Sequence, residues 1–171
     1  MIDWSSAIKN YTFLVTGAAG FIGFHVARAL LEQGAPVVGL DNYSDYYSPA
    51  LKRDRDRELR QYPQFVSVEL DLADLPALET LFTRHRPQKI CHLAAQAGVR
   101  YSLINPFAYQ QANLEGFLNL LELAKRHAAE RFVYASSSSV YGGLTDLPFS
   151  EDQRTDTPIS LYAATKRADE L

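Results

Sequence analysis

The sequence predicts an α/β fold in which a doubly wound parallel sheet carries helices on both faces. Short apolar runs alternate with helical patterns five times along the chain. The connections between them are short, and there is no linker, internal repeat or low-complexity segment. Glycines and polar residues follow the ends of the apolar runs. Strands that alternate with helices pair in parallel, because each helix returns the chain to the same edge of the sheet.

The expected strands are short apolar runs, as is typical of strands buried on both faces of a parallel sheet. They occupy residues 11–16, 36–41, 65–71, 89–95 and 131–137. The expected helices occupy residues 21–33, 50–61, 75–85, 107–128 and 159–171. Gly34 follows the first helix, where a left-handed cap commonly ends a helix. The alternating charges of residues 50–61 predict a solvated helix face.

Composition and charge exclude several classes of protein. The net charge of −3 gives no basic footprint for nucleic acid, and no apolar run approaches the ~20 residues of a membrane span. The single Cys91 fits a reducing compartment, and the first ten residues lack the apolar segment of a signal peptide. Cys91 and His92 lie in an expected strand without metal-ligand spacing. We therefore expect a cytoplasmic protein with no metal, membrane or nucleic-acid partner.

A glycine-rich turn follows the first expected strand and opens the first helix. In "TGAAGFIG", Gly17, Gly20 and Gly23 stand at three-residue intervals. Glycines so placed allow a tight turn, close approach of a phosphate and packing of helix on strand. The N–H groups of the helix start, at Phe21 and Ile22, favour a pyrophosphate. This context on both sides of the glycines predicts a dinucleotide site.

Residues after the next three strands complete the predicted cofactor site. Asp41 and Asn42 end the second strand, and a carboxylate there accepts hydrogen bonds from ribose hydroxyls and repels a 2′-phosphate. The cofactor is therefore expected to be NAD rather than NADP. Further candidates are Asp71 and Leu72, next to the adenine, and Leu93, Ala94 and Ala95, along the cofactor backbone.

Tyr162 and Lys166 are spaced to share one face of the last helix. The spacing alone also fits two amphipathic side chains on a solvated helix. A free tyrosine, with a pKa of about 10, is a poor base at neutral pH, but a nearby ammonium group favours the phenolate. A run of serines, 136–139, follows the fifth strand at the predicted binding edge of the sheet.

With these motifs together, the chain resembles the extended short-chain dehydrogenase/reductase family over residues 11–171. The glycines match the glycine pattern of that family, Tyr162 and Lys166 match its active-site pair, and "ASSSSVYG" holds its hydroxyl partner. The resemblance implies a Rossmann-like fold for residues 11–171 and a short N-terminal extension, 1–10. It also implies that the last strands and the substrate-binding portion lie beyond Leu171, so that this chain is the cofactor half.

Within that family, "DNYSDYY", "AAQAGVRYSL", "YASSSSVYG" and "SLYAATK" look most like UDP-glucuronate 4-epimerases. Related 4,6-dehydratases carry an Asp-Glu pair where this chain has Ser138 and Ser139. The resemblance implies oxidation of a UDP-sugar at C4 and return of the hydride to the other face of the 4-keto sugar. An epimerase for another UDP-sugar, a decarboxylating dehydrogenase and a non-catalytic NAD-binding module remain alternatives.

The resemblance also assigns roles to individual residues. It implies that Ser137, with Tyr162 and Lys166, is catalytic, although the choice within 136–139 is open by one position. Ser138, Ser139 and Arg100 are candidates for the substrate, while Arg100 fits a surface residue equally well. Asn113 is expected near the nicotinamide, unless its amide satisfies backbone groups. The family implies a homodimer through the helices 107–128 and 159–171.

Overall fold

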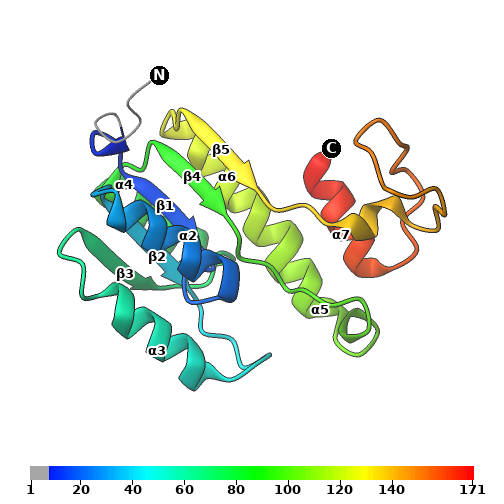
Figure 1. The fold of residues 1–171 in the computed structure, drawn as a ribbon, viewed down its shortest axis with the longest axis horizontal. Coiled ribbons are helices and arrows are strands. Elements are labelled where there is room, and N and C mark those ends of the chain that lie inside the picture. The colour runs from blue at the N-terminus through cyan, green and yellow to red at the C-terminus, as the bar shows by residue number, and fades with distance from the viewer. Residues whose placement is uncertain (1–7) are drawn as a thin grey trace. The chain divides into compact units, whose positions relative to one another are not determined.

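The computed structural model describes residues 8–171, which contain a parallel sheet of five strands with the order β3-β2-β1-β4-β5 (Figure 1). The strands are β1 (Phe13–Thr16), β2 (Val37–Asp41), β3 (Phe65–Glu69), β4 (Lys89–His92) and β5 (Arg131–Tyr134). The order reverses between β1 and β4, which is where a doubly wound sheet binds ligands. The structure confirms the predicted fold class.

The described helices are α2 (Phe21–Glu32), α3 (Pro49–Leu59), α4 (Leu75–His85), α5 (Pro106–Tyr109), α6 (Gly116–Arg126) and α7 (Leu161–Glu170). A π-helical stretch, η2 (Gln110–Glu115), joins α5 to α6. Short 3-10 turns form η1 (Tyr101–Leu103) and η3 (Ser138–Tyr141). Gly34 follows α2 with φ +82°, as the left-handed cap requires. None of the helices within residues 8–171 has the length and apolar character needed to cross a bilayer.

Several expected elements are wrong in their bounds. The strands expected over 11–16 and 65–71 occupy Phe13–Thr16 and Phe65–Glu69, and other elements also differ. The strand expected over 131–137 ends at Tyr134, and that expected over 89–95 ends at His92. The helix expected over 107–128 begins at Pro106, ends at Arg126 and is π-helical in its middle. Ladder pairing decides the strand ends, because β4 pairs with β1 and β5 only through His92. The residues that follow His92 and Tyr134 therefore lie outside the sheet ladders.

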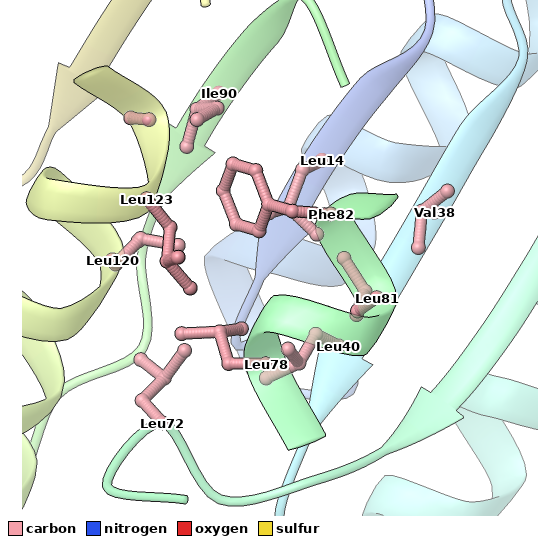
Figure 2. Packing of buried hydrophobic residues seen from close by; sticks show 11 residues of the cluster. Leu14, Val38, Leu40, Leu72, Leu78, Leu81, Phe82, Ile90, Leu120 and Leu123 are labelled. Carbon is pink, nitrogen blue, oxygen red and sulfur yellow. The ribbon is translucent and has the colours of Figure 1, made fainter. Parts of the chain in front are cut away.

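Alternating strand residues build two cores, one on each face of the sheet. Leu14 and Val38 pack with Phe82 of α4 and Leu123 of α6 (Figure 2). Their neighbours Val15 and Val37 point to the other face, where they pack with Phe24 and Leu31 of α2 and Leu59 of α3. Because successive strand side chains point to opposite faces, apolar runs without alternation are what this two-sided burial needs.

The chain divides into two compact units, which are described separately. The sheet unit comprises residues 8–94 and 119–134, and the helical unit comprises residues 95–118 and 135–171. In the helical unit, α7 packs against η2 and η3. The buried Tyr109 donates to the carbonyl of Ala97, 2.9 Å away, and to that of Gly98. Residues 1–7 of the expected N-terminal extension lie outside the described residues.

The expectation of a solvated charged face on α3 is wrong for two residues, since Lys52 and Asp56 are buried. Asp56 accepts hydrogen bonds from Ser67 Oγ and from Arg60 Nε, the latter at 2.6 Å. A charge leaves water at low cost only when such partners replace its hydration. The charge pattern of α3 alone does not reveal those partners, because Ser67 lies on β3.

Candidate functional site

The glycine-rich turn between β1 and α2 has no space for a β-carbon at Gly17 or Gly23. Gly17 has φ +68°, and a β-carbon on it would lie 2.8 Å from the backbone nitrogen of Ala94. A β-carbon on Gly23 would lie only 2.0 Å from the carbonyl oxygen of Gly17. The Gly20 N–H donates to the same oxygen at 2.9 Å. The predicted reasons for these glycines, a tight turn and close helix packing, therefore agree with the geometry.

The start of α2 is built to face an anion. Its N-cap, Gly20, provides no side-chain cap, and its first turn has no acidic residue. The first N–H groups of a helix have no partner within the helix and carry a partial positive charge. The side chains of Phe21 and Ile22, which belong to this turn, are exposed. The backbone of this turn can therefore hold phosphate oxygens.

Thr16 fixes the ends of β1 and β4 at the point where the strand order reverses. Its buried Oγ1 lies 2.7 Å from His92 Nδ1 and accepts hydrogen bonds from the N–H groups of Leu93 and Ala94, at 3.1 and 3.2 Å. These bonds position the backbone of Leu93 and Ala94 beside Gly17. Ala95, the third candidate of this stretch, is exposed and begins the helical unit.

Asp41 lies buried at the end of β2, and both of its carboxylate oxygens are held by the backbone. Oδ2 accepts from the N–H of Ala19 at 3.1 Å, and Oδ1 accepts from that of Tyr43 at 2.8 Å. A carboxylate has about four lone-pair positions, so these two bonds leave acceptors free for a ribose diol. The carboxylate is thus oriented by the glycine turn itself through Ala19.

Lys52 of α3 supplies the cation nearest to Asp41. Its Nζ lies 3.8 Å from Asp41 Oδ1 and donates to both the carbonyl oxygen and Oγ of Ser44, each at 3.0 Å. It also lies 4.7 Å from the centre of the Tyr47 ring. Burial lowers the pKa of Lys52, whereas the Asp41 carboxylate acts in the opposite direction. Lys52 therefore connects α3, the loop after β2 and the predicted ribose acceptor.

The structure brings Asn42 and Asp71 together at the ends of β2 and β3. Asn42 Nδ2 donates to Asp71 Oδ2 at 2.9 Å, and Asp71 Oδ1 accepts from the N–H of Ala73 at 2.9 Å. The Leu72 side chain is part of the core beneath α4 and α6. The part of Leu72 that is available to an adenine is therefore its backbone, which the sequence did not indicate.

Tyr162 and Lys166 lie on α7 of the helical unit, where the predicted helical spacing is confirmed. The half-buried Tyr162 packs edge-on against Tyr109, with ring centres 6.0 Å apart. Lys166 is buried, and its Nζ lies 2.7 Å from Asp169 Oδ2. Ser160 caps this helix by accepting from the N–H of Ala163 at 3.1 Å.

Asn113 is buried on η2 and makes the backbone bonds that the sequence left open as an alternative. Its Oδ1 accepts from the Gln96 N–H at 2.8 Å, and its Nδ2 donates to the Gln96 carbonyl at 3.0 Å. Nδ2 also lies 3.0 Å from Thr165 Oγ1 on α7. Asn113 therefore joins η2 to the helix of Tyr162 and Lys166, and a direct role near the nicotinamide stays a prediction.

The serines 136–139 differ in what they bind. Ser136 Oγ donates to Glu170 of α7, and Ser137 Oγ accepts from the N–H of Ser139 at 3.2 Å. Ser138 is exposed and begins η3. Arg100 is also exposed, at the start of η1, as its alternative surface role requires. The catalytic role of Ser137 and the substrate roles of Ser138, Ser139 and Arg100 remain predictions.

Sequence reasoning missed Thr16, Lys52 and Asp169. Thr16 was read only as the end of a strand, and Lys52 as part of a solvated helix face. The available signal for Lys52 was a single lysine on the buried side of α3, about two helical turns before Leu59. Within residues 8–171, no group of three or more His, Cys, Asp or Glu side chains is arranged to hold a metal ion.

Comparisons with known proteins agree with this geometry. UDP-glucuronate 4-epimerase 3 of Arabidopsis thaliana is 52% identical over 163 residues, which are 95% of this chain and 38% of the relative. The Bacillus cereus UDP-glucuronic acid 4-epimerase, solved with UDP-glucuronic acid and NAD, has a TM-score of 0.83 at 35% identity, covering 93% of this chain and 50% of that one. The Thermus thermophilus UDP-glucose 4-epimerase, solved with NAD, has a TM-score of 0.80 at 35% identity, covering 93% and 48%.

The chain thus spans about half the length of these relatives, or less. Residues 14–171 match the family described as GDP-mannose 4,6 dehydratase. This match includes the glycine turn, Asp41 and the Tyr162–Lys166 pair, which are the features that the resemblance rested on. The chain belongs to that family, among the extended short-chain dehydrogenases/reductases.

Proposed function

We propose that this chain is the cofactor half of an NAD-dependent UDP-sugar 4-epimerase, and that the reaction converts UDP-glucuronate to UDP-galacturonate. The observation that carries the proposal is the tightly packed glycine turn. The N–H of Ala19 in this turn bonds to the Asp41 carboxylate, so the carboxylate lies next to the start of α2. The domain expectation, a Rossmann-like domain over residues 11–171 followed by a substrate portion outside this chain, forms part of the proposal.

The residues of the sheet unit fit NAD. The N–H groups around Phe21 and Ile22 would hold the pyrophosphate, and Asp41 would accept from the adenosine ribose. The buried negative charge of Asp41 disfavours a 2′-phosphate at that position. Asn42, Asp71 and the backbone of Leu72 would border the adenine. When bound, NAD supplies a hydride acceptor that returns the hydride within the same catalytic cycle.

The helical unit supplies the proton chemistry. Tyr162, as phenolate, would take the proton from the 4-hydroxyl while C4 loses its hydride and becomes a carbonyl carbon. Ser137 would donate a hydrogen bond to the reacting oxygen. Lys166 would favour the phenolate electrostatically and bind the ribose of the nicotinamide. Return of the proton and hydride, the hydride to the opposite face of C4, gives the epimer with no net oxidation.

The choice of UDP-glucuronate rests on similarity and on the serine run. The Arabidopsis relative, at 52% identity, is named a UDP-glucuronate 4-epimerase. Ser138 and Ser139 stand where dehydratases carry an Asp-Glu acid/base pair, so this chain lacks that pair for dehydration. Oxidation of a glucuronate at C4 makes a β-keto acid that tends to lose carbon dioxide. We assign Arg100 and these serines to holding the carboxylate away from the geometry that decarboxylates.

We further propose that the protein is a cytoplasmic homodimer. It pairs through two helices, α7 at residues 161–170 and the helix 106–126. Phe107 and Leu118 are 78% and 59% exposed on it, and Leu114 and Leu121 are also exposed. Exposed apolar side chains of this kind favour association with a second copy. A charge at Leu118, as in Leu118→Lys, is expected to shift sedimentation toward the monomer, whereas an unchanged sedimentation coefficient would reject this interface.

The experiment that tests the proposed function is a calorimetric titration of this chain with NAD and with NADP. NAD is expected to bind at least tenfold more tightly, and Asp41→Ala is expected to remove most of that preference. Equal binding of both cofactors, or of neither, would contradict the proposal. The intact mass of the protein from its natural source tests the second part, since a mass above that of 171 residues indicates a longer polypeptide.

The second candidate function is that of a non-catalytic NAD-binding module, and a turnover assay with UDP-sugars distinguishes it from an epimerase. A module binds NAD but leaves UDP-sugars unchanged at every chain length. The presence of Tyr162, Lys166 and the serine run favours the enzyme, since a sensing module has no need of this set. An epimerase for another UDP-sugar would convert that sugar in preference to UDP-glucuronate.

A further inference from the structure

Asp169 is a buried carboxylate of α7 that the proposed chemistry does not use. Its side chain is 1% exposed, and that of Lys166 is 3% exposed. Asp169 Oδ2 lies 2.7 Å from Lys166 Nζ. Asp169 Oδ1 is buried and has no hydrogen-bond partner among the described residues. An ion pair this well removed from water is costly to form, so it needs a reason beyond surface charge.

The three side chains lie in one row on α7. Residues 162, 166 and 169 are separated by four and then three positions, which places them on the same helix face. Lys166 is therefore in the middle of the row, between the phenol and the carboxylate. A lysine ammonium on a flexible four-carbon stem has many orientations unless a partner selects one. Asp169 is the partner that the structure provides.

Neighbouring charges do not offer Lys166 another carboxylate. Glu170, the next residue, is held by Arg167 Nη1 at 2.8 Å and by Ser136 Oγ. Two uncharged side chains from other elements lie at this part of α7, Tyr109 against Tyr162 and Asn113 against Thr165. Burial raises the pKa of Asp169, and Glu170 adds to this, while the hydrogen bond from Lys166 opposes it. The two charges of the pair therefore depend on each other.

We propose that Asp169 is a positioning residue that holds the amine of Lys166 in a fixed orientation on the Tyr162 face of α7. The inference rests on the proposed function, since it is the catalytic lysine that Asp169 positions. The free Oδ1 leaves the carboxylate able to accept a second hydrogen bond without releasing Lys166. Without Asp169, the amine of Lys166 loses the hydrogen-bond partner that holds it in place.

Competitive acylation of the whole chain with acetic anhydride, read by mass spectrometry, tests this inference. Only an unprotonated amine reacts, and Lys125, whose side chain is 80% exposed, serves as the internal reference. Asp169→Asn is expected to raise the labelling of Lys166 relative to Lys125 by about tenfold, the size expected for a lost hydrogen bond between charged groups. Asp169→Glu is expected to restore the protection, which a purely steric role of Asp169 would not do.

Glu170→Gln is the matched control, because it removes from the same turn a carboxylate that makes no hydrogen bond to Lys166 but binds Arg167 and Ser136. An unchanged labelling ratio in Asp169→Asn, or an equal rise in Glu170→Gln, would overturn the inference. Asp169→Ser, with the same expected rise, replaces Asp169→Asn should the latter be unfolded by circular dichroism. The labelling uses neither cofactor nor sugar, so its failure is distinct from failure to bind NAD or to epimerise.

Discussion

Substitution of Gly23 by alanine tests the packed glycine turn most sharply. The added carbon would lie 2.0 Å from the carbonyl oxygen of Gly17 and 2.7 Å from its carbonyl carbon. To reach even 3.0 Å, below which real β-carbons essentially never come, the turn must open by about 1 Å. Both atoms belong to the backbone, so no side chain can rotate away to relieve the contact.

Two effects of opposite sign decide the size of the change. Alanine is favoured over glycine within a helix by about 1 kcal/mol. Overpacking costs about 1–3 kcal/mol, and a rigid backbone contact belongs at the upper end. The net loss of unfolding free energy is therefore expected to be about 2 kcal/mol. Because the turn that opens is the proposed phosphate site, NAD affinity is expected to fall by at least tenfold.

Urea unfolding followed by circular dichroism, with NAD titration in parallel, measures both quantities. Gly143→Ala is the matched control, since a β-carbon there meets nothing within 4 Å. It is expected to leave stability within about 0.5 kcal/mol of the original chain. If Gly23→Ala behaves like Gly143→Ala in both measurements, the steric account of the turn is refuted.

Three further predictions follow from the contacts. Thr16→Val removes the side-chain acceptor of the Ala94 N–H, whereas the Leu93 N–H keeps its bond to the Thr16 carbonyl. This change is expected to cost about 1–3 kcal/mol of unfolding free energy in urea titration, and a loss of less than about 0.5 kcal/mol would contradict this role of Thr16. Lys52→Met removes the hydrogen bonds to Ser44 in the loop after β2 and the ion pair with Asp41. Calorimetry is therefore expected to show NAD affinity lowered about tenfold, and an unchanged affinity would contradict this role of Lys52. The hydrogen bonds from Arg53 lower the pKa of Glu69 in the folded protein. The pair therefore stabilises the fold fully above the pKa of an unfolded glutamate, about 4.3. This contribution is lost as the pH falls through the lower pKa that Glu69 has in the folded protein. Arg53→Gln should therefore lower the melting temperature at pH 7 and change it less at pH 3, and an equal effect at both pH values would contradict the assignment.

The fold was predictable from sequence because a parallel sheet leaves a simple pattern. Apolar runs of strand length without alternation indicate strands that are buried on both faces. The three glycines of "TGAAGFIG" indicate a tight turn between a strand and a helix. The cofactor-site residues at strand ends follow from the same topology. Asp41 was predicted in this way, and the structure confirms its position at the end of β2.

Contacts between distant segments were not predictable in the same way. Lys52 was interpreted as a solvated residue, because its partners Ser44 and Asp41 lie in another element. The Leu72 side chain enters the core although its neighbour Asp71 faces the site, and only the chain path after β3 decides this. The sequence of α7 also allows Lys166 to pair with Glu170, and only the structure shows that Lys166 pairs with Asp169 and that Arg167 pairs with Glu170.

The central claim is tested most directly by incubating UDP-glucuronate with the protein at its natural length and a trace of NAD. The 4-epimers are then separated by chromatography, in the original protein and in Tyr162→Phe. We expect UDP-galacturonate to form without accumulation of NADH, and Tyr162→Phe to lose this activity while still binding NAD. Release of carbon dioxide with equimolar NADH, or conversion of a different UDP-sugar with UDP-glucuronate left intact, would contradict the account.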